Sequence, residues 1–256
     1  MNFRECFDLA GNVALVTGAS RGIGESVVRA LAASGARVIV SSRNQEPCEA
    51  IASSIRRDGG DAEAMASHMG DTQRIAALIA NIEARYGRLD ILVNNAATNP
   101  HFGSILDTDA AAFEKTVAVN LRGYFFCSSH AAKLMAKNGS GSIVNVASIA
   151  GIAPGTATGI YAITKGAVIA MTKAFACECA PLGVRVNAIL PGFTDTRFSS
   201  ALVDDPDRLA RIVARVPLGR IAGPDEMSGA VLYLASKASS YTTGACLIVD
   251  GGYLAG

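Results

Sequence analysis

Tyr161, Lys165 and Ser148 are the residues whose types and spacing point most directly to chemistry. Tyr161 and Lys165 are four residues apart, so on a helix their side chains project from the same face. A nearby ammonium favours the phenolate and lowers a tyrosine pKa from its usual value of about 10. Tyr161 is therefore a candidate proton donor and acceptor near neutral pH, as the interconversion of an alcohol and a carbonyl requires. Such a spacing also arises by chance on helix surfaces, so its meaning depends on the rest of the chain.

Ser148 follows an apolar run, Ser142–Val146, that is typical of a buried strand. In open parallel sheets, ligands bind beyond the carboxyl ends of the strands, and Ser148 stands at such an end. Its hydroxyl can hold and polarise the oxygen that Tyr161 protonates. A serine hydrolase is the poorer interpretation, because no G-x-S-x-G turn surrounds Ser148 and the histidines show no supporting pattern.

Short apolar runs alternate with helix-length amphipathic segments along the whole chain. The strand candidates are Val13–Val16, Arg37–Val40, Ala62–Ala66, Ile91–Val93, Ser142–Val146, Val184–Leu190 and Ala245–Val249. The helix candidates are Ile23–Ser34, Pro47–Arg57, Thr72–Tyr86, Ala110–Lys137, Gly159–Ala180 and Pro224–Ala235. Continuous apolar strands between helices are typical of a parallel sheet covered on both faces. With right-handed crossovers, this order predicts an α/β chain whose doubly wound parallel sheet forms a single domain over residues 1–256.

The composition of the chain limits which binding partners and which cellular compartment we expect. The 256 residues are 50% hydrophobic and 18% charged, with a formal net charge of +1. We therefore expect a sizeable core, and neither nucleic acid nor an anionic membrane as a partner. No uncharged apolar run is long enough to cross a membrane, no signal sequence is evident, and six scattered cysteines suit reduced thiols, so we expect a cytoplasmic protein. Cys177 and Cys179 would face different ways on a helix, so we expect no metal site.

A glycine-rich loop follows the first expected strand and precedes a helix, as in a dinucleotide-binding βαβ unit. The loop residues are Gly18, Ala19, Ser20, Arg21, Gly22, Ile23 and Gly24. Gly18 permits a tight turn, Gly22 lets the backbone approach a pyrophosphate, and Gly24 allows close helix packing. The free N–H groups at the helix N-terminus suit a phosphate. A glycine-rich surface turn is the alternative, which the flanking strand and helix disfavour.

The second expected strand is followed by Ser42 and Arg43 rather than by a carboxylate. Sites that prefer the unphosphorylated cofactor place an acid here to bind the ribose 2′-hydroxyl. Arg43 and Arg21 can instead contact a 2′-phosphate, whose geometry suits arginine. The sequence therefore predicts NADP(H) in preference to NAD(H), with a solvated Arg43 as the alternative.

Two helix candidates, Ala110–Lys137 and Gly159–Ala180, carry apolar residues around most of their circumference. Such a helix must be covered on more than one side. Either the sheet and its neighbours bury it, or a second subunit packs on it. The second interpretation predicts a homo-oligomer that uses these two helices.

A series of motifs occurs in order along the chain. They are Thr17-Gly18-x-x-x-Gly22-x-Gly24, Asp71-Thr72, Asn94-Asn95-Ala96-Ala97, Asn120, Ser148, Tyr161-x-x-x-Lys165 and Pro191-Gly192-x-x-x-Thr196. In this order and spacing they resemble the short-chain dehydrogenase/reductase family over nearly the full length of the chain. The resemblance implies a seven-stranded Rossmann fold, a nicotinamide cofactor and a tetramer, a dimer of dimers, built on the two apolar helices.

The resemblance also implies roles at the adenosine end of the cofactor. Asp71, with the Thr72 backbone beside it, is expected to contact the adenine, although by itself Asp71 would be a helix N-cap. Asn95 and Ala96 are expected to line the adenosine ribose. Ala97 departs from the family, which has glycine there, and its methyl group would crowd the strand end if the position needed glycine's backbone freedom.

Further implied roles concern the nicotinamide and the proton. By resemblance, Lys165 binds the nicotinamide ribose, and Asn120 holds a water that relays a proton from Lys165. A polar residue inside an apolar helix is otherwise a satisfied core amide, and we favour the relay. The residues expected to hold the nicotinamide amide and the phosphates are Pro191, Gly192, Thr194 and Thr196.

Substrate choice is expected to depend on residues 194–217, which mix charges with apolar side chains such as Leu202 and Val203 and suit a lid. An ordinary surface helix is the alternative. A partly apolar pocket is suggested by side chains that flank the catalytic segments, namely Phe102, Ile152, Pro154 and Ile160.

Three functions remain open at this point. The first is a carbonyl reductase or secondary-alcohol dehydrogenase with a small carbonyl or alcohol substrate, which we favour. The second is a 3-oxoacyl-acyl-carrier-protein reductase, which the chain also resembles; its acidic partner needs basic residues at the ends of the long helices, where only Lys133 and Lys137 are available. The third is a non-catalytic dinucleotide sensor or scaffold, which the presence of both Tyr161 and Lys165 disfavours.

Overall fold

Seven strands form one sheet in a computed structural model that describes residues 3–199 and 205–255. The strands are β1 (Val13–Thr17), β2 (Arg37–Ser41), β3 (Asp61–Ala64), β4 (Ile91–Asn94), β5 (Gly141–Val146), β6 (Val184–Pro191) and β7 (Cys246–Val249). Their order across the sheet is β3-β2-β1-β4-β5-β6-β7, and all neighbours pair in parallel. The order reverses between β1 and β4, which confirms the expected doubly wound, single-domain fold.

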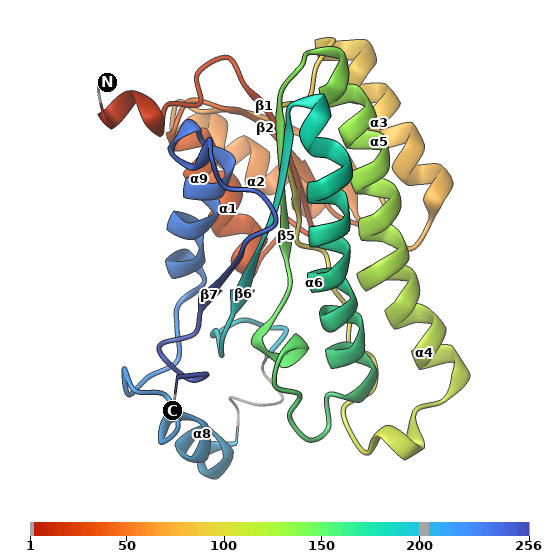
Figure 1. The fold of residues 1–256 in the computed structure, drawn as a ribbon, viewed down its shortest axis with the longest axis vertical. Helices are drawn as coiled ribbons and strands as arrows, with labels where there is room; N and C mark the ends of the chain where they lie inside the picture. The colour runs from red at the N-terminus through yellow and green to blue at the C-terminus, as the bar shows by residue number, and fades with distance from the viewer. Residues whose placement is uncertain (1–2, 200–204, 256) are drawn as a thin grey trace.

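Helices cover both faces of the sheet. They are α1 (Gly22–Ala33), α2 (Gln45–Arg57), α3 (Thr72–Tyr86), α4 (Ala110–Val117), α5 (Gly123–Lys137), α6 (Gly159–Cys179), α8 (Pro206–Val213) and α9 (Ser228–Ala235). α3, α5 and α6 lie on one face, and α1, α2 and α9 on the other (Figure 1). Side chains alternate along each strand. Val16 therefore packs on the face covered by α1, α2 and α9, and its neighbour Leu15 packs on the face covered by α3, α5 and α6. Burial on both faces explains why the central strands, such as β1 and β4, are continuous apolar runs, whereas the edge strands β3 and β7 are partly exposed.

The helix expected over Ala110–Lys137 is interrupted. A π-helical turn, Ala118–Arg122, separates α4 from α5, and within it the N–H of Gly123 donates to the carbonyl of Ala118. Gly123 packs on the backbone of the loop after β3, since a Cβ there would lie 2.1 Å from the Met69 carbonyl oxygen. π-helical turns are frequent at functional sites, and this one contains Asn120.

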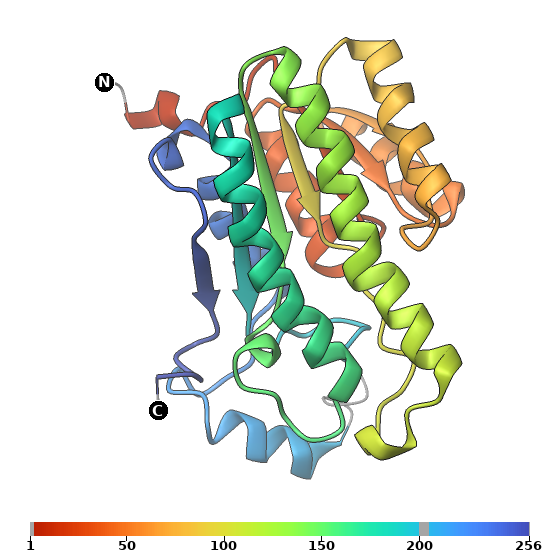
Figure 2. The same cartoon turned by 45° about the vertical axis from the view of Figure 1, so that its right-hand side comes forward.

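The segment Gly159–Leu182, which comprises α6 and the turn after it, has a mean hydropathy of 1.3 and is long and apolar enough to cross a membrane by composition. The expectation that the chain lacks such a segment is therefore too simple. In the structure α6 packs along the sheet (Figure 2), and its inner face buries Val168 and Thr172 completely. We interpret it as a core helix.

The carboxyl ends of the strands point to one edge of the sheet, the lower edge in Figures 1 and 2, where α8 also lies. The segment expected as a lid leaves β6 here and is closed at its base by two hydrogen bonds. The N–H of Asp195 donates to Ala222 O at 2.8 Å, and the N–H of Ala222 donates to Phe193 O at 2.9 Å. The described part of this segment contains α8, whereas Leu202 and Val203 lie outside the described residues.

The turn Ile149–Gly151, just after β5, lies directly against the backbone of α6. A Cβ added at Gly151 would lie 2.7 Å from the Lys165 carbonyl carbon and 2.8 Å from the Gly166 nitrogen. Side chains do not tolerate such distances, so glycine is what permits this approach. The contact sets the distance between the end of β5 and the first turns of α6.

Replacing Gly151 by alanine should force these two elements apart. We expect Gly151→Ala to lower the free energy of unfolding by about 1–3 kcal/mol, as overpacking does in other cores. Gly155→Ala is the matched control, because a Cβ there has nothing within 4 Å, and it should be no less stable than the parent. Urea unfolding measures both, and equal stability of the two variants would show that the contact is unimportant.

Candidate active site

The residues predicted for catalysis and cofactor binding all gather at the carboxyl edge of the sheet. The cofactor candidates are Gly18, Ser20, Arg21, Gly22, Ile23 and Gly24 after β1, Ser42 and Arg43 after β2, Asp71 and Thr72 after β3, Asn95 and Ala96 after β4, and Pro191, Gly192, Thr194 and Thr196 at the end of β6. The catalytic candidates are Ser148 after β5, Asn120 in the π-helical turn, and Tyr161 and Lys165 in the first turns of α6. The switch between β1 and β4 lies at the centre of this edge, where doubly wound sheets bind ligands.

Ser148 and Tyr161 meet between the turn after β5 and the start of α6. Ser148 Oγ accepts a hydrogen bond from the N–H of Ala150 at 3.1 Å, which orients the side chain. The same side chain lies near the Tyr161 phenol, where it acts to lower the pKa of that phenol. Two hydroxyls in this arrangement can hold one substrate oxygen, as the sequence predicts.

The pKa of Tyr161 departs from the expectation. The sequence predicts that Lys165 lowers it, whereas in the structure burial raises it to about 12 and the Ser148 hydroxyl acts in the opposite direction. The physical reason is that Lys165 is itself buried, and burial lowers the pKa of its ammonium to about 7. The attraction of a partly charged Lys165 for the phenolate is therefore too small to offset the effect of burial on Tyr161.

Lys165 is held at the end of β5, behind Tyr161. Its Nζ donates to the Val146 carbonyl oxygen at 2.6 Å and to the Tyr124 hydroxyl at 3.4 Å. Nζ lies 5.7 Å from the centroid of the Tyr161 ring. Sequence reasoning missed Tyr124, whose sole signal is a tyrosine one helical turn after Asn120.

Asn120 is fully buried, and its amide is fully bonded. Nδ2 donates to Thr98 O at 2.9 Å and to Thr164 Oγ1 at 3.3 Å, while Oδ1 accepts from the N–H of Thr98 at 2.8 Å. These bonds tie the loop after β4 to α6. Both N–H groups of the amide are thus satisfied by protein, and the relay water expected at Asn120 stays a prediction.

The loop after β1 fits a bound phosphate. α1 begins without a side-chain cap, since Arg21 at its N-cap makes no such hydrogen bond, so the first N–H groups remain open to an anion. Gly22 has a φ of +57°, and a Cβ there would meet the Thr196 side chain at 3.3 Å. Gly18 and Gly24 serve the packing of the loop itself, because a Cβ at either would come within 2.7 Å of a backbone atom.

Two exposed arginines lie in this loop and after the neighbouring strand β2. Arg21 precedes α1 and Arg43 follows β2, and within the described part of the chain neither guanidinium has an ion-pair partner. Ser42, beside Arg43, has its hydroxyl 3.0 Å from the Cys48 sulfur. Both guanidinium groups are therefore available to an anionic ligand.

Two residues expected at the adenosine use their side chains within the protein. The Asp71 carboxylate caps α3, accepting from two N–H groups of its first turn at 3.0 and 3.1 Å. Asn95 Nδ2 donates to the carbonyls of Thr17 at 2.9 Å and Gly18 at 3.1 Å, so it braces the glycine-rich loop. The contacts of Asp71 and Asn95 with an adenosine stay predictions.

Ala97 fits its position without strain. Among the described residues, Ala157 alone combines a side chain with a positive φ, of 64°. Ala97 therefore has an ordinary backbone conformation, and the position does not require glycine.

The end of β6 forms the base of the lid segment. Gly192 packs tightly on β7, since a Cβ there would lie 2.6 Å from the Asp250 Cα. Thr194 is buried, and its hydroxyl donates to Gly192 O at 3.2 Å. The N–H of Thr196 donates to Ser199 Oγ at 3.0 Å.

Aromatic side chains connect the lid segment to the catalytic elements. The Phe198 ring lies 5.5 Å from the Tyr161 ring, and the Arg208 guanidinium of α8 lies 5.5 Å from the Phe102 ring. These contacts bring described parts of the segment against the catalytic elements, with apolar surfaces beside Tyr161, and its action as a lid stays a prediction. Ile160, which the sequence suggests for the pocket, is buried in the core instead.

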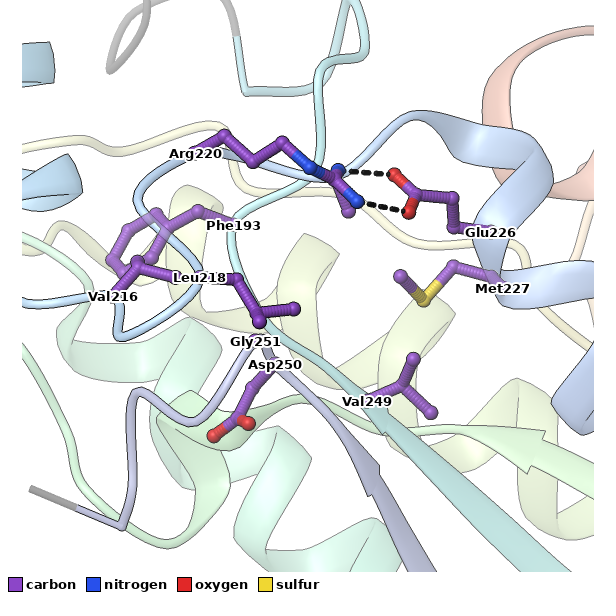
Figure 3. A pocket seen from close by; sticks show the side chains of 10 residues that line it. Phe193, Val216, Leu218, Arg220, Glu226, Met227, Val249, Asp250 and Gly251 are labelled. Atoms are coloured by element: carbon purple, nitrogen blue, oxygen red, sulfur yellow. Dashed lines mark hydrogen bonds and ion pairs between the residues drawn. The ribbon is translucent and has the colours of Figure 1, made fainter.

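A cavity of about 150 Å³ lies beneath the base of the lid segment (Figure 3). Its apolar walls come from Phe193, Val216, Leu218, Met227 and Val249. Arg220 and Glu226 form a two-point ion pair at its rim, with both N–O distances 2.7 Å, and this pair lowers the Glu226 pKa to about 2. The catalytic residues do not line this cavity, so we interpret it as part of the anchor of the lid segment.

Comparison with known proteins agrees with this geometry. A family model described as enoyl-(acyl carrier protein) reductase matches residues 18–254. Dehydrogenase/reductase SDR family member 4 of Bos taurus is 38% identical over 246 residues, which cover 96% of this chain and 88% of the relative. The cis-4-hydroxycyclohexanecarboxylate dehydrogenase of Sinomonas cyclohexanicum is also 38% identical, over 96% of this chain and 98% of the relative.

Solved structures extend the likeness to the whole fold. A gluconate 5-dehydrogenase from Burkholderia cenocepacia J2315, in complex with NADP and tartrate, matches with a TM-score of 0.96 and 34% identity over 99% of both chains. The chain therefore belongs to the short-chain dehydrogenase/reductase family and is an NAD(P)-dependent enzyme that acts on CH–OH groups.

Proposed function

We propose that this enzyme is an NADP(H)-dependent carbonyl reductase, and in the reverse direction a secondary-alcohol dehydrogenase, with Tyr161 as its general acid and base. The observation that carries the proposal is the meeting of three groups at the carboxyl edge. The Ser148 hydroxyl lies near the Tyr161 phenol and acts to lower its pKa, and Lys165 Nζ lies behind the phenol, 5.7 Å from the centroid of its ring. When bound, the nicotinamide cofactor supplies or accepts the hydride.

In the reductive direction, negative charge develops on the carbonyl oxygen of the substrate. The Tyr161 hydroxyl donates its proton to this oxygen. The Ser148 hydroxyl donates a second hydrogen bond to it and stabilises the developing charge. A phenol whose pKa is about 12 remains protonated at neutral pH, so Tyr161 is ready as the acid.

Lys165 and Asn120 support this transfer from behind. The Lys165 ammonium, held on Val146 O, stabilises the phenolate that remains once Tyr161 has given up its proton. Asn120 binds the loop after β4 to Thr164, and so holds that loop and α6 together. We assign Asn120 this bracing role, and we propose separately the relay water that the resemblance implies.

Apolar side chains around the catalytic segments favour a ketone with an apolar or alicyclic body. Phe198 lies beside Tyr161, and Phe102 and Ile152 are 39% and 52% exposed although they are large and apolar. The relative from Sinomonas cyclohexanicum is named for an alcohol on a cyclohexane ring, which fits this chemistry. The gluconate 5-dehydrogenase is named for a polar sugar acid, so a sugar acid is the informative comparison substrate.

The acyl-carrier-protein alternative has less support. Lys137, one of the two lysines available to an acidic partner, forms an ion pair with Glu83 of α3. Lys133 remains exposed on α5. A single exposed lysine is a weak docking site for an acidic protein.

The function is tested with a panel of ketones and NADPH absorbance. Cyclohexanone and acetophenone should give higher kcat/KM than a ketogluconate or an acetoacetyl thioester. Tyr161→Phe should lower kcat by about 10²–10⁴-fold, the usual contribution of a general acid, and leave NADPH binding largely intact by fluorescence titration. Tyr241→Phe, at a fully exposed position, should change neither quantity. Near-normal turnover by the Tyr161 variant would overturn the mechanism.

The preference for NADP(H) is supported by the two available guanidinium groups. Arg21 lies in the glycine-rich loop and Arg43 after β2, and no carboxylate follows β2 to repel a 2′-phosphate. The open N-terminus of α1 would hold the pyrophosphate, with Gly22 leaving room for its approach. Arginine binds phosphate at two points and so adds both affinity and specificity.

Removing one guanidinium should therefore change the choice of cofactor. Arg43→Ala should lower kcat/KM for NADPH by about 10- to 100-fold and leave the value for NADH nearly unchanged, since one charge-assisted contact is lost. Arg57→Ala, which removes the same charge from the exposed end of α2, is the control. A wild-type preference for NADH would refute the assignment.

We also propose that the enzyme is a homo-oligomer, a dimer of dimers, that packs through α4, α5 and α6. Large apolar side chains on these helices are exposed by 38–58%, namely Phe113, Phe125, Phe126 and Ile163. Phe125 also lies edge-on to Phe175 of α6 at 5.3 Å, so the aromatic surface is continuous across both helices. Exposed apolar patches of this kind are typical of protein contacts.

Sedimentation velocity tests the oligomer directly. The wild-type protein should sediment as a dimer or tetramer at micromolar concentration, and Phe125→Arg should shift it towards smaller species. Tyr241→Arg places the same charge at an exposed position outside these helices and should not. A monomeric wild-type protein would contradict the proposal.

A further inference from the structure

Tyr124 is a buried tyrosine for which the mechanism above has no use. It lies in the first turn of α5, directly after the π-helical turn, and is 1% exposed. Its hydroxyl donates to the carbonyl oxygen of Val146, the last residue of β5, at 3.3 Å. A buried hydroxyl needs a partner, and this long bond satisfies it only weakly.

Lys165 lies against the same side chain. Its Nζ donates to the Tyr124 hydroxyl oxygen at 3.4 Å and lies 5.1 Å from the centroid of the Tyr124 ring. Nζ also donates to Val146 O at 2.6 Å, so ammonium, phenol and carbonyl form a closed triangle. An ammonium taken out of water needs such partners, and an aromatic face adds to them.

We propose that Tyr124 is a positioning residue for the reaction, which holds the Lys165 ammonium at the end of β5 and keeps it charged behind Tyr161. The inference rests on the proposed function, because Tyr124 affects catalysis only through Lys165 and Tyr161. An apolar residue at this position would fill the same space but leave the ammonium, which has three N–H donors, with one acceptor fewer.

The other titratable groups in this cluster stay neutral near pH 7. Besides burial, Tyr161 of α6 and Cys127 of α5 both raise the pKa of Tyr124. Burial raises the pKa of Tyr161 and that of Cys127 to about 12. In the described part of the chain no carboxylate pairs with Lys165. The pKa of Lys165, lowered by burial to about 7, makes it the group that changes charge near neutrality.

The variant Tyr124→Phe removes the hydroxyl and keeps the ring. The charged form of Lys165 then loses a hydrogen-bond acceptor, so the Lys165 pKa should fall further below its usual value. Loss of one hydrogen bond to a charged group corresponds to a downward shift of about one pH unit. Since this shift concerns the lysine itself, it can be measured in the absence of cofactor and substrate.

The first measurement is a titration of the cofactor-free protein with [ε-¹³C]lysine, followed by NMR. The Lys165 signal is identified by its absence in Lys165→Met. We expect its midpoint to move down by about one pH unit in Tyr124→Phe. Tyr124→Met removes hydroxyl and ring together in a side chain that packs adaptably, and it should shift the midpoint further.

The second measurement is the pH profile of ketone reduction. Reductive kcat/KM should fall as pH rises through the Lys165 pKa, because a neutral lysine no longer stabilises the phenolate. In Tyr124→Phe this falling limb should move to lower pH by about one unit, with a smaller change on the low-pH plateau. A merely structural role would lower activity equally at every pH.

The matched control is Tyr233→Phe on α9, which removes a hydroxyl that lies 3.0 Å from Thr242 Oγ1 and does not contact Lys165. It should leave both the titration and the pH profile unchanged. An unchanged Lys165 midpoint in both Tyr124 variants would overturn the proposal. A protein that reduces no ketone would refute the proposed function instead, and the NMR titration would still decide the role of Tyr124.

Discussion

The burial of the Lys165 ammonium at the end of β5 is the interaction on which the site depends. Nζ is bound to the Val146 carbonyl at 2.6 Å, and burial lowers its pKa to about 7. A strand end offers such a carbonyl because the sheet ladder stops there. The bond requires β5 and α6 to keep a fixed separation, and Gly151 provides it by letting the turn after β5 approach the backbone of Lys165. Burying the Lys165 ammonium lowers the stability of the fold, and it makes the protonation of Lys165 sensitive to neighbouring groups.

A network of buried polar side chains also connects β5 and α6, together with β4 and α5, and holds these elements in register. Asn94 of β4 donates from Nδ2 to Ser128 Oγ and to Asn145 Oδ1, each at 2.9 Å. Asn145 of β5 in turn donates to Thr172 Oγ1 of α6 at 2.9 Å. Such networks favour one arrangement of a core over its alternatives. Among the described residues, Asn94 Oδ1 has no protein partner in this network.

Most of the fold could be predicted from the sequence because its signals are local. All the expected strands occur, because burial on both faces makes the central strands continuous apolar runs. α3 also has the predicted bounds. The break in the expected helix Ala110–Lys137 could not be predicted. It accompanies the close approach of Gly123 to the carbonyl of Met69, a residue far away in the sequence. α8 lies in the segment expected as a lid, for which a surface helix was the alternative, and it has no buried residue that would mark its bounds in the sequence.

The sequence by itself determined which chemical groups meet at the site. The spacing of Tyr161 and Lys165 and the glycine-rich loop act within one or two turns of chain, so they retain their meaning wherever the fold places them. Tertiary structure decided the state of those groups. It raised the Tyr161 pKa that the spacing alone would lower, satisfied the Asn120 amide, and brought the unsuspected Tyr124 to Lys165. The physical reason is that protonation and hydrogen bonding depend on burial and on partners from distant segments, which no local pattern records.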